Sequence, residues 1–530
     1  MSMAAFDGVA TVEIVTGRHG FFALANANRV PLGAAVVLKN ATLGDFTWRA
    51  GGGAAKLGVT AGATISARAG IDYWPTAALQ RNIIAGNDGS VRKDDGLGAS
   101  WTVLVTTMTT AGAVPHLSVA GAEAAGNARK VFYMDGVNLP RALAADGTVM
   151  TTLISTNVDW AGANQPRWSC PHQGSNWAGG NANAPHTAYK SLATDHADFQ
   201  TTPYRLICGP LPNQQYTVGA LSYKGGLLVF CYPVGVYFIN TSTDPSSANW
   251  FPVQVAIPGA GGPRCFCQVE DDVIWVDPAG QWHSLAVASA GQDKASIRAS
   301  DISYRKLGSW GSTNMALAQL PYADLIYYSD RQEVMLSYAP IGQTAKTARL
   351  HLDMNNRAEV GENWVTWDRD RNEALYLRVK TGGREIPAMM DNVGQVWELD
   401  QAARTKDGGP YTWEFKLQDT DFAQSNPKWA GRWKNLRFVQ VEAQASGAGG
   451  SLTLQVWLDG VHRQTVTIAI PSTGSTLPQT LPFTLGAAGF VMSRPRRLYG
   501  RCRRLSLRGE IVAAGTDVHI SKLVVGLEAA

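Results

Sequence analysis

The stretch "LLVFCYPVGVYFIN", from Leu227 to Asn240, decides how this chain is expected to fold. Residues 227–233 form a nearly continuous apolar run, a glycine follows at 235, and the apolar run resumes at 236–239. Two apolar runs separated by a short turn are typical of antiparallel strands joined in a hairpin. We therefore predict a strand, a turn and a second strand over these residues.

The same unit recurs along the chain, each time with turn residues between two apolar runs. Asn, Asp and Gly favour such turns because they tolerate backbone conformations that other residues avoid. A helical pattern, with apolar residues at i, i+3, i+4 and i+7 over about 12 residues, is not found. Further hairpin turns are predicted at Asn87-Asp88-Gly89, Asp135-Gly136, Asp277-Pro278-Ala279-Gly280, Asp330-Arg331 and Asp391-Asn392-Val393-Gly394.

The spacing of these turns points to one architecture. Gly89 and Gly136 are 47 residues apart, Gly235 and Gly280 are 45 apart, and Gly280 and Arg331 are 51 apart. Four-stranded propeller blades repeat about every 40–50 residues, and a single blade cannot bury both of its faces. We predict an all-β fold with a β-propeller of six to eight blades. A series of β-sandwiches is the alternative, and the long, regular interval favours the propeller.

Two regions depart from the repeat. Gly136 and Gly235 are 99 residues apart, and between them lies "WAGANQPRWSCPHQGSNWAGGNANAPH", which is rich in Gly, Asn and Pro. We interpret this as an inserted long-loop region near 160–215, since long loops in compact folds are usually functional. After "TKDGG", apolar and polar residues alternate, and Asp459-Gly460 is a strong hairpin signal. The prediction is a propeller at 1–408 and an antiparallel β-sandwich at 409–530.

Composition restricts the class of protein. The chain has 530 residues, of which 45% are hydrophobic and only 17% charged, which argues against disorder. The six cysteines include the pair "CFC" at 265 and 267 but no C-x-x-C spacing, so packed, reduced thiols are expected rather than a metal site. The N-terminus resembles no signal peptide, and no apolar run approaches the ~18 residues of a membrane helix. We expect synthesis in the cytoplasm and no membrane insertion.

Catalytic motifs are missing from the sequence. Neither G-x-x-x-x-G-K-[ST], G-x-S-x-G nor H-E-x-x-H occurs. His196 lies beside Asp195 and Asp198, which suggests a metal or acid–base site, but an aspartate that bonds to its own turn explains the pattern as well. We assign no catalytic, cofactor-binding or metal-binding residue and expect that the chain is not an enzyme.

One stretch suggests an alternative function. "KDDGLGASW", residues 93–101, resembles the aspartate box of sialidase-type propellers, with one residue more between Asp95 and Trp101. Such boxes stabilise blade turns and take no part in catalysis. Together with loop tryptophans such as Trp168 and Trp177, the stretch allows a propeller that binds glycans or hydrolyses glycosidic bonds, a reaction that needs two carboxylates across a cleft.

The most distinctive charged segment is "SRPRRLYGRCRRLSLRG", residues 493–509. From Tyr411 to the end the chain has 14 Lys and Arg and 8 Asp and Glu, a net charge of +6, whereas the whole chain carries +4. Arginine binds carboxylates and phosphates with two parallel hydrogen bonds. A subunit interface with an acidic neighbour ranks first, a solvated strand face second and a nucleic-acid contact third. The candidate contacts are Arg494, Arg496, Arg497, Arg501, Arg503 and Arg504.

Several stretches in the order found here resemble a known family. They are "RKVFYMDGVNLPRALAADG", "PHTAYKSLATDHADF", "YKGGLLVFCYPVGVYFIN", "DDVIWVDPAGQWHSL", "DTDFAQSNPKWAGRWKNLRF" and "GRCRRLSLRGEIVAAGTDVHI". Over roughly residues 125–300 and 410–525, this chain is similar to the propeller-containing tail nozzle proteins of short-tailed bacteriophages. The first 120 residues resemble them only as generic blades.

The resemblance implies a structural protein of the virion, made in the host cytoplasm. Proteins of this family form a homo-oligomeric ring, commonly a hexamer, that extends the tail. The ring's lumen conducts the viral DNA during ejection, an adaptor or portal-side protein docks on one side, and fibres or spikes attach outside. The family implies no catalytic residue and no cofactor.

Overall fold

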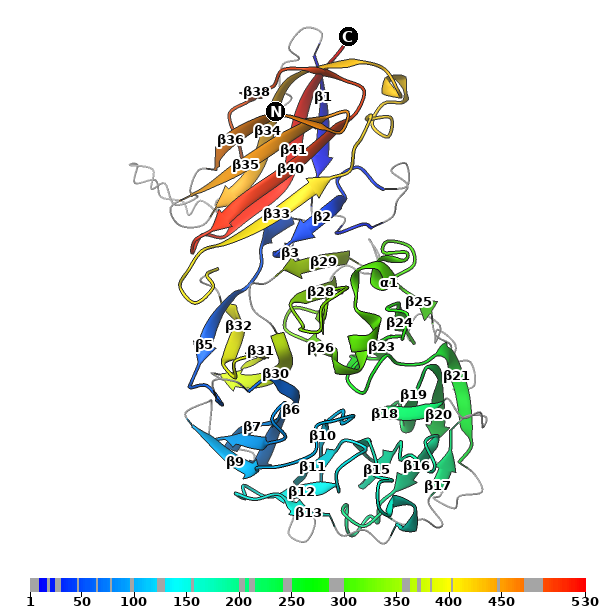
Figure 1. Ribbon diagram of the computed structural model, residues 1–530. Coiled ribbons are helices and arrows are strands. Elements are labelled where there is room, and N and C mark those ends of the chain that lie inside the picture. Colours follow the sequence, from blue (N-terminus) through cyan, green and yellow to red (C-terminus); the bar gives the residue numbers. More distant parts are fainter. Residues whose placement is uncertain are drawn as a thin grey trace, which may run out of the picture.

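The computed structural model describes most of the chain, and every structural statement below concerns these residues: 9–16, 20–23, 30–44, 47–62, 65–76, 79–95, 100–121, 129–153, 157–199, 205–208, 215–241, 250–285, 300–354, 363–368, 373–381, 384–401, 404–445, 449–470 and 490–530. The fold is all-β, as expected. A ring of small antiparallel sheets carries a β-sandwich on one side, and both described ends of the chain lie in that sandwich (Figure 1).

Six independent four-stranded sheets form the blades of a β-propeller in the described part of the chain. The hairpin from which the prediction began is β19–β20 of the fourth blade, and Leu227 pairs with Ile239 across it. In chain order the blades are β6 (Ala67–Thr76), β7 (Leu79–Gly86), β8 (Val91–Asp94) and β9 (Trp101–Val105); β10 (His116–Ala120), β11 (Lys130–Met134), β12 (Arg141–Ala144) and β13 (Thr151–Thr152); β14 (Trp168–His172), β15 (Ser175–Gly179), β16 (Thr187–Lys190) and β17 (Arg205–Ile207); β18 (Tyr216–Tyr223), β19 (Gly226–Tyr232), β20 (Val234–Asn240) and β21 (Pro252–Pro258); β22 (Phe266–Val269), β23 (Asp272–Val276), β24 (Trp282–Ser284) and β25 (Ser300–Asp301); and β30 (Glu373–Thr381), β31 (Arg384–Asp391) and β32 (Val396–Gln401) with β5 (Gly53–Leu57).

The ring closes through strands from distant parts of the sequence. β5 pairs antiparallel with β32, so a strand near the N-terminus completes the last blade. Between the blade of β22–β25 and the blade of β30–β32, the circle is completed by β26 (Asp324–Tyr328), β27 (Glu333–Tyr338), β28 (Ala348–Asp353) and β29 (Asn363–Asp368).

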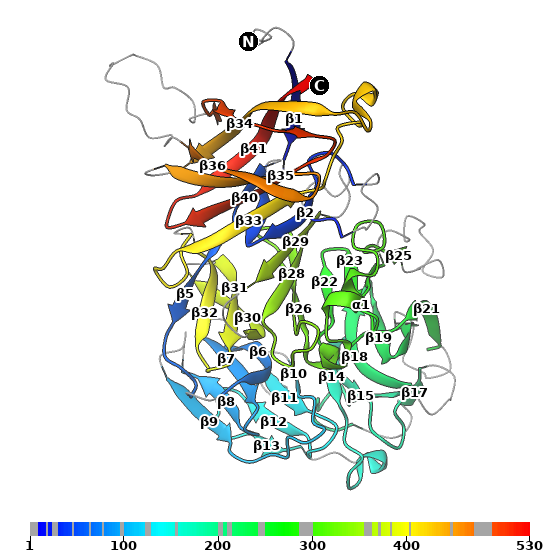
Figure 2. The same ribbon diagram turned by 45° about the horizontal axis from the view of Figure 1, so that its top comes forward.

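The strands β26–β29 also join the propeller to the sandwich. Their sheet continues through β2 (Ala35–Lys39), β33 (Tyr411–Leu417), β40 (Leu505–Ala513), β35 (Gly450–Leu458) and β36 (Val461–Ile470), which makes nine strands in all. Figure 2 shows this sheet running from the ring into the sandwich. One hydrophobic core extends across the same joint, from Leu350 and Trp364 to Trp413 and Val525. The two parts are therefore held together by hydrogen bonds and by packing.

The second layer of the sandwich is an eight-stranded sheet. Its long central strands are β34 (Lys434–Ala445) and β41 (Val518–Ala529), and around them lie β1 (Ala10–Val15), β3 (Ala41–Gly44), β4 (Thr47–Ala50), β37 (Val491–Met492), β38 (Arg496–Arg497) and β39 (Arg501–Cys502). The short helices are α1 (Trp310–Asn314), η2 (Val158–Trp160), η6 (Leu317–Tyr322) and η7 (Pro427–Trp429).

Two predicted boundaries differ from the structure. Strands β1–β4 were expected in a propeller at 1–408, but they pair within the two large sheets of the sandwich. β1 and β4 pair with β41 in one sheet, and β2 lies between β29 and β33 in the other. The region near 160–215 was expected to be an insertion of long loops, whereas β14–β17 form a regular blade there. Gly, Asn and Pro are dense in that stretch, and Pro171 and Asn176 even lie inside β14 and β15, which hid the strand pattern.

The blades β18–β21 and β22–β25 approach each other closely at one pair of aromatic rings. Phe230 of β19 and Phe266 of β22 are stacked with their ring centroids 4.2 Å apart and an interplanar angle of 4°. Gly219 in β18 leaves the space for the Phe266 ring, because a Cβ atom at this position would lie 2.4 Å from its Cζ atom.

We expect Gly219→Ala to lower the free energy of unfolding by about 1–3 kcal/mol, the usual cost of overpacking a core. The added methyl group would push Phe266 out of its stack on Phe230. Denaturant unfolding checks this, with Gly409→Ala as the control because the nearest atom there lies 3.3 Å from the added Cβ. Equal stability of the two variants would contradict the prediction.

Candidate interaction surface

The arginine-rich segment lies along the outer edge of the eight-stranded sheet. β37, β38 and β39 pair one after another with β34. The backbone bonds continue between the short strands, where Leu436 N–H donates to the oxygen of Gly500 at 2.9 Å and Leu498 N–H donates to that of Arg437 at 3.0 Å. Residues 491–502 thus follow β34, and among the described strands β37–β39 pair with β34 alone.

Buried anchors along this segment turn the arginines outward. Leu498 is 2% exposed and Cys502 is 0% exposed, and both belong to the core of the sandwich. Arg501 lies between these two anchors, Arg497 comes just before Leu498 and Arg503 just after Cys502, and all three side chains are exposed. All six arginines predicted as contacts are exposed: Arg494, Arg496, Arg497, Arg501, Arg503 and Arg504.

Within the part of the chain that the structure describes, the charge of this edge is not neutralised. Among the residues that the structure describes, none of the six guanidinium groups forms an ion pair. Two carboxylates near this edge have other partners: Glu528 accepts a hydrogen bond from Nε of Arg437 at 2.6 Å, and Asp459 accepts from the backbone N–H of Arg504 at 2.8 Å. Arg508, the seventh arginine of the segment, differs because it pairs with Glu414 and Glu510. The six therefore stay available to a partner.

An exposed tryptophan holds two of the arginines in place. The guanidinium carbons of Arg501 and Arg503 lie 5.2 Å and 4.9 Å from the ring centroid of Trp433, which is 40% exposed. Cation–π contacts of this kind contribute about 0.5–1 kcal/mol each at exposed sites. Trp433 was not predicted as part of the site, because it lies far from the arginines in the sequence. Its place in "GRWKNLRF", just before β34, was the only signal.

Two hollows adjoin this edge. A groove of about 820 Å³ lies between 435–438 of β34, 495–501 of the arginine segment and Val9. A pocket of about 430 Å³ lies between the loops 30–34 and 417–424, and Arg504 is part of its wall. Arg501 lines the groove and Arg504 lines the pocket, so the segment 501–504 connects the two.

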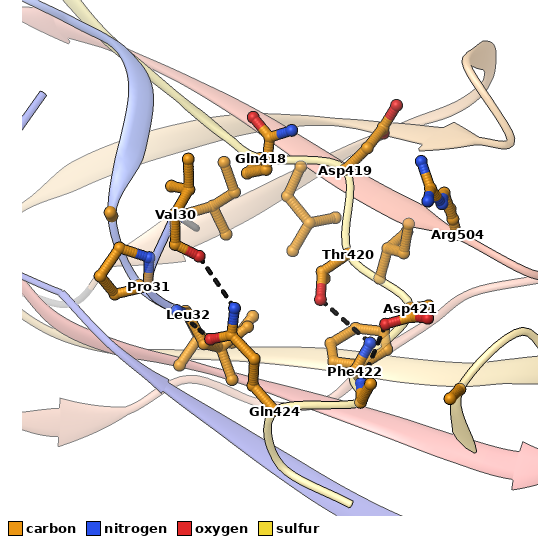
Figure 3. Close-up of a pocket in the computed structure, with 18 residues that line it drawn as sticks. Val30, Pro31, Leu32, Gln418, Asp419, Thr420, Asp421, Phe422, Gln424 and Arg504 are labelled. Atoms are coloured by element: carbon orange, nitrogen blue, oxygen red, sulfur yellow. Dashed lines mark hydrogen bonds between the residues drawn. The ribbon is translucent and has the colours of Figure 1, made fainter. Parts of the chain in front are cut away.

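The smaller pocket is held open by side-chain hydrogen bonds (Figure 3). Gln424 joins its two loops, since its Oε1 accepts from Leu32 N–H at 2.8 Å and its Nε2 donates to the oxygen of Val30 at 2.9 Å. Asp421 accepts from Ala423 N–H at 3.0 Å and so stabilises its own turn. Asp419 and Arg504 lie on the same side of the pocket in the figure, and between them they give its rim both charges.

The other sites considered from the sequence are structural. Nε2 of His196 lies 2.9 Å from the oxygen of Gly174. Asp195 accepts from Ala197 N–H at 2.9 Å, so this aspartate bonds to its own turn. In the box-like stretch, Thr102 donates to Asp95 at 3.1 Å, and the indole N–H of Trp101 donates to the oxygen of Val59 at 3.1 Å. These side chains stabilise turns.

The tryptophans expected to be exposed for a glycan are buried instead. Trp168 is 0% exposed and Trp177 is 1% exposed, because both lie on strands of the third blade. Within the described ranges, no group of three or more His, Cys, Asp or Glu residues is arranged to hold a metal ion. The helices found there are all too short or too polar to cross a membrane.

The fold and this surface define the class: an all-β protein in which a β-propeller is joined to a β-sandwich. No protein-family model and no curated protein matches the chain. Among solved structures, it is similar to YCF48 bound to D1 peptide, with 11% identity, a TM-score of 0.37, and coverage of 65% of this chain and 94% of that one.

Two further structures give the same result. YCF48 from Cyanidioschyzon merolae has 8% identity and a TM-score of 0.39, and the match covers 66% of this chain and 98% of that one. The BBS1N structure in complex with ARL6DN has 7% identity and a TM-score of 0.36, with 66% and 93% covered. These similarities concern the propeller fold alone.

Proposed function

We propose that this chain is a structural subunit of a bacteriophage tail, of the nozzle type, that assembles into a homo-oligomeric ring of six copies. The ring would conduct DNA during ejection and dock an adaptor or portal-side protein and fibres or spikes. In this proposal the chain is made in the host cytoplasm, is located in the virion and is not an enzyme. The sequence resemblance set out above supports the proposal.

The observation that carries the proposal is the arginine edge. Six exposed guanidinium groups with no ion pair in the described chain lie beside a groove, and such a surface suits a protein neighbour. The continuous nine-stranded sheet also supports an assembly role, because a neighbour that binds the sandwich transmits force to the ring through hydrogen-bonded strands. The glycan-binding or glycosidase alternative receives no support from Trp168 and Trp177, because both are buried.

Native mass spectrometry of the purified full chain tests the assembly. One subunit has a mass of 56.8 kDa, so a hexamer is expected at six times that value. Antibody-labelled virions viewed by electron microscopy should carry the label on the tail. A protein that is monomeric both in purified form and in the virion would overturn the proposal.

A further inference from the structure

We infer that the arginine edge and the groove beside it bind an extended, acidic segment of a partner protein that also carries an apolar side chain. This inference rests on the proposed assembly function and names the chemistry of the partner. It joins three features of the surface: exposed arginines without an ion pair in the described chain, an apolar floor, and a groove that lies along two paired segments.

The positive charge of the arginine edge favours an acidic partner. Arg497 and Arg501 both line the groove, and Arg503 is held beside Arg501 on the ring of Trp433. Contact with the ring restricts the two guanidinium groups, so less entropy is lost when each binds a carboxylate through two hydrogen bonds. Glu528 and Asp459, two carboxylates near this edge, already accept hydrogen bonds within the chain. An acidic partner would supply the missing negative charge.

The apolar floor of the groove favours binding of a protein over binding of a nucleic acid. Leu436 is 3% exposed and belongs to the sandwich core, so the accessible apolar surface of the groove comes from the partly buried Phe438 and from Val9 and Pro495. An apolar side chain of a partner would gain about 25 cal/mol for each Å² of apolar surface that it buries in the groove. A phosphate backbone would gain nothing from such a floor. Base stacking is also disfavoured, because the Trp433 ring already contacts two guanidinium groups.

The shape of the groove suits an extended segment, because the groove lies between 435–438 of β34 and the arginine segment that pairs with β34. Part of the outer strand edge is already bonded, since Nε2 of Gln464 in β36 donates to the oxygen of Arg497 at 3.3 Å and its Oε1 accepts from Tyr499 N–H at 3.2 Å. An extended segment would therefore bind through its side chains, every second one of which points toward the same face. Carboxylates would then face the arginines while an apolar side chain enters the groove. Tyr499, 69% exposed, lines the same groove and offers further apolar area.

The test measures binding of a fluorescent peptide of alternating Glu and Leu, as long as the segment 491–502, by anisotropy. We expect saturable binding that weakens as the salt concentration rises. The double variant Arg501→Glu/Arg503→Glu should weaken it by at least about tenfold, and Arg497→Glu should also weaken it. Arg305→Glu is the matched control, because Arg305 is an exposed arginine of the propeller. Unchanged thermal midpoints would show that the variants are folded.

Three other probes of the same length decide between partners. A Glu–Ser peptide should bind more weakly than the Glu–Leu peptide, and a Lys–Leu peptide should not bind. Single-stranded DNA that binds as tightly as the Glu–Leu peptide would overturn the inference in favour of a phosphate ligand. Equal binding of the Glu–Ser and Glu–Leu peptides, or no loss in the double variant, would also overturn it.

The same samples separate this inference from the proposed function. A ring that assembles but does not bind the Glu–Leu peptide overturns the inference alone. A chain that binds the peptide yet is monomeric in purified form and in the virion overturns the assembly function.

Discussion

Replacing Trp48 by alanine is expected to lower the free energy of unfolding by about 3–5 kcal/mol, the usual cost of removing a large buried aromatic side chain. Trp48 lies in β4 and is 0% exposed. Its ring centroid is 5.0 Å from that of Phe415 in β33, and its backbone pairs with Ile520 of β41. One side chain near the N-terminus therefore fills the core between two strands of the C-terminal part.

Denaturant unfolding of the full chain measures the effect of Trp48→Ala. Tyr499→Ala is the matched control, because Tyr499 is an aromatic residue of the same sandwich but is 69% exposed. The control should change the stability by no more than about 0.5 kcal/mol. If Trp48→Ala were equally mild, the N-terminal strands would not be part of the folded sandwich.

The second large effect is expected at Glu333, which is buried where the propeller meets the sandwich. Its carboxylate accepts a hydrogen bond from Thr42 at 2.8 Å and lies 3.6 Å from Nδ1 of His351. Burial alone would raise the pKa of Glu333, but the hydrogen bond and charge of His351, the charge of Arg331 and the Thr42 hydroxyl outweigh it and lower the pKa to about 2. The carboxylate is thus more stable in the folded chain than in the unfolded one.

The sign of the pH dependence follows from this lowered pKa. Glu333 stabilises the fold above its ordinary pKa of 4.5, and that contribution is lost as the pH falls toward about 2. Glu333→Gln should cost about 3–5 kcal/mol at neutral pH, because it removes one member of a buried charged group. Below pH 4.5 the stability of the variant should fall less steeply than that of the unaltered chain.

Unfolding curves recorded at several pH values test the role of Glu333. The control is Glu13→Gln, since Glu13 is 59% exposed and lies 3.5 Å from Lys522 in a surface ion pair. Such pairs contribute at most about 1 kcal/mol. Parallel pH profiles of Glu333→Gln and the unaltered chain would show that another group causes the loss of stability in acid.

The sequence predicted the local structure well because hairpins are specified by neighbouring residues. The turns at Asp277–Gly280 and Asp391–Gly394 lie between β23 and β24 and between β31 and β32, as their Asp and Gly residues indicated. The regular interval between such turns predicted the propeller. Where turn residues were unusually dense, near 160–215, the same local reasoning mistook a blade for loops.

For the candidate site, the sequence identified the charge but not its surroundings. The six arginines were found because a run of one charge is visible without any structure. Their exposure depends on anchors such as Leu498 and Cys502, which become buried only when the segment pairs with β34. Trp433 and the groove come from the other side of that pairing and could not be predicted from local patterns.

The sequence by itself determined that this is a chain of β-hairpins, a repeating propeller and a basic C-terminal segment, because turn chemistry and strand alternation act over a few residues. Only the tertiary structure decided that β1–β4 complete the sandwich, that β5 closes the ring and that one sheet joins the two parts. The physical reason is that any exposed strand edge offers the same backbone donors and acceptors. Which distant strand covers it is settled by burial of whole faces, such as that of Trp48 against Phe415.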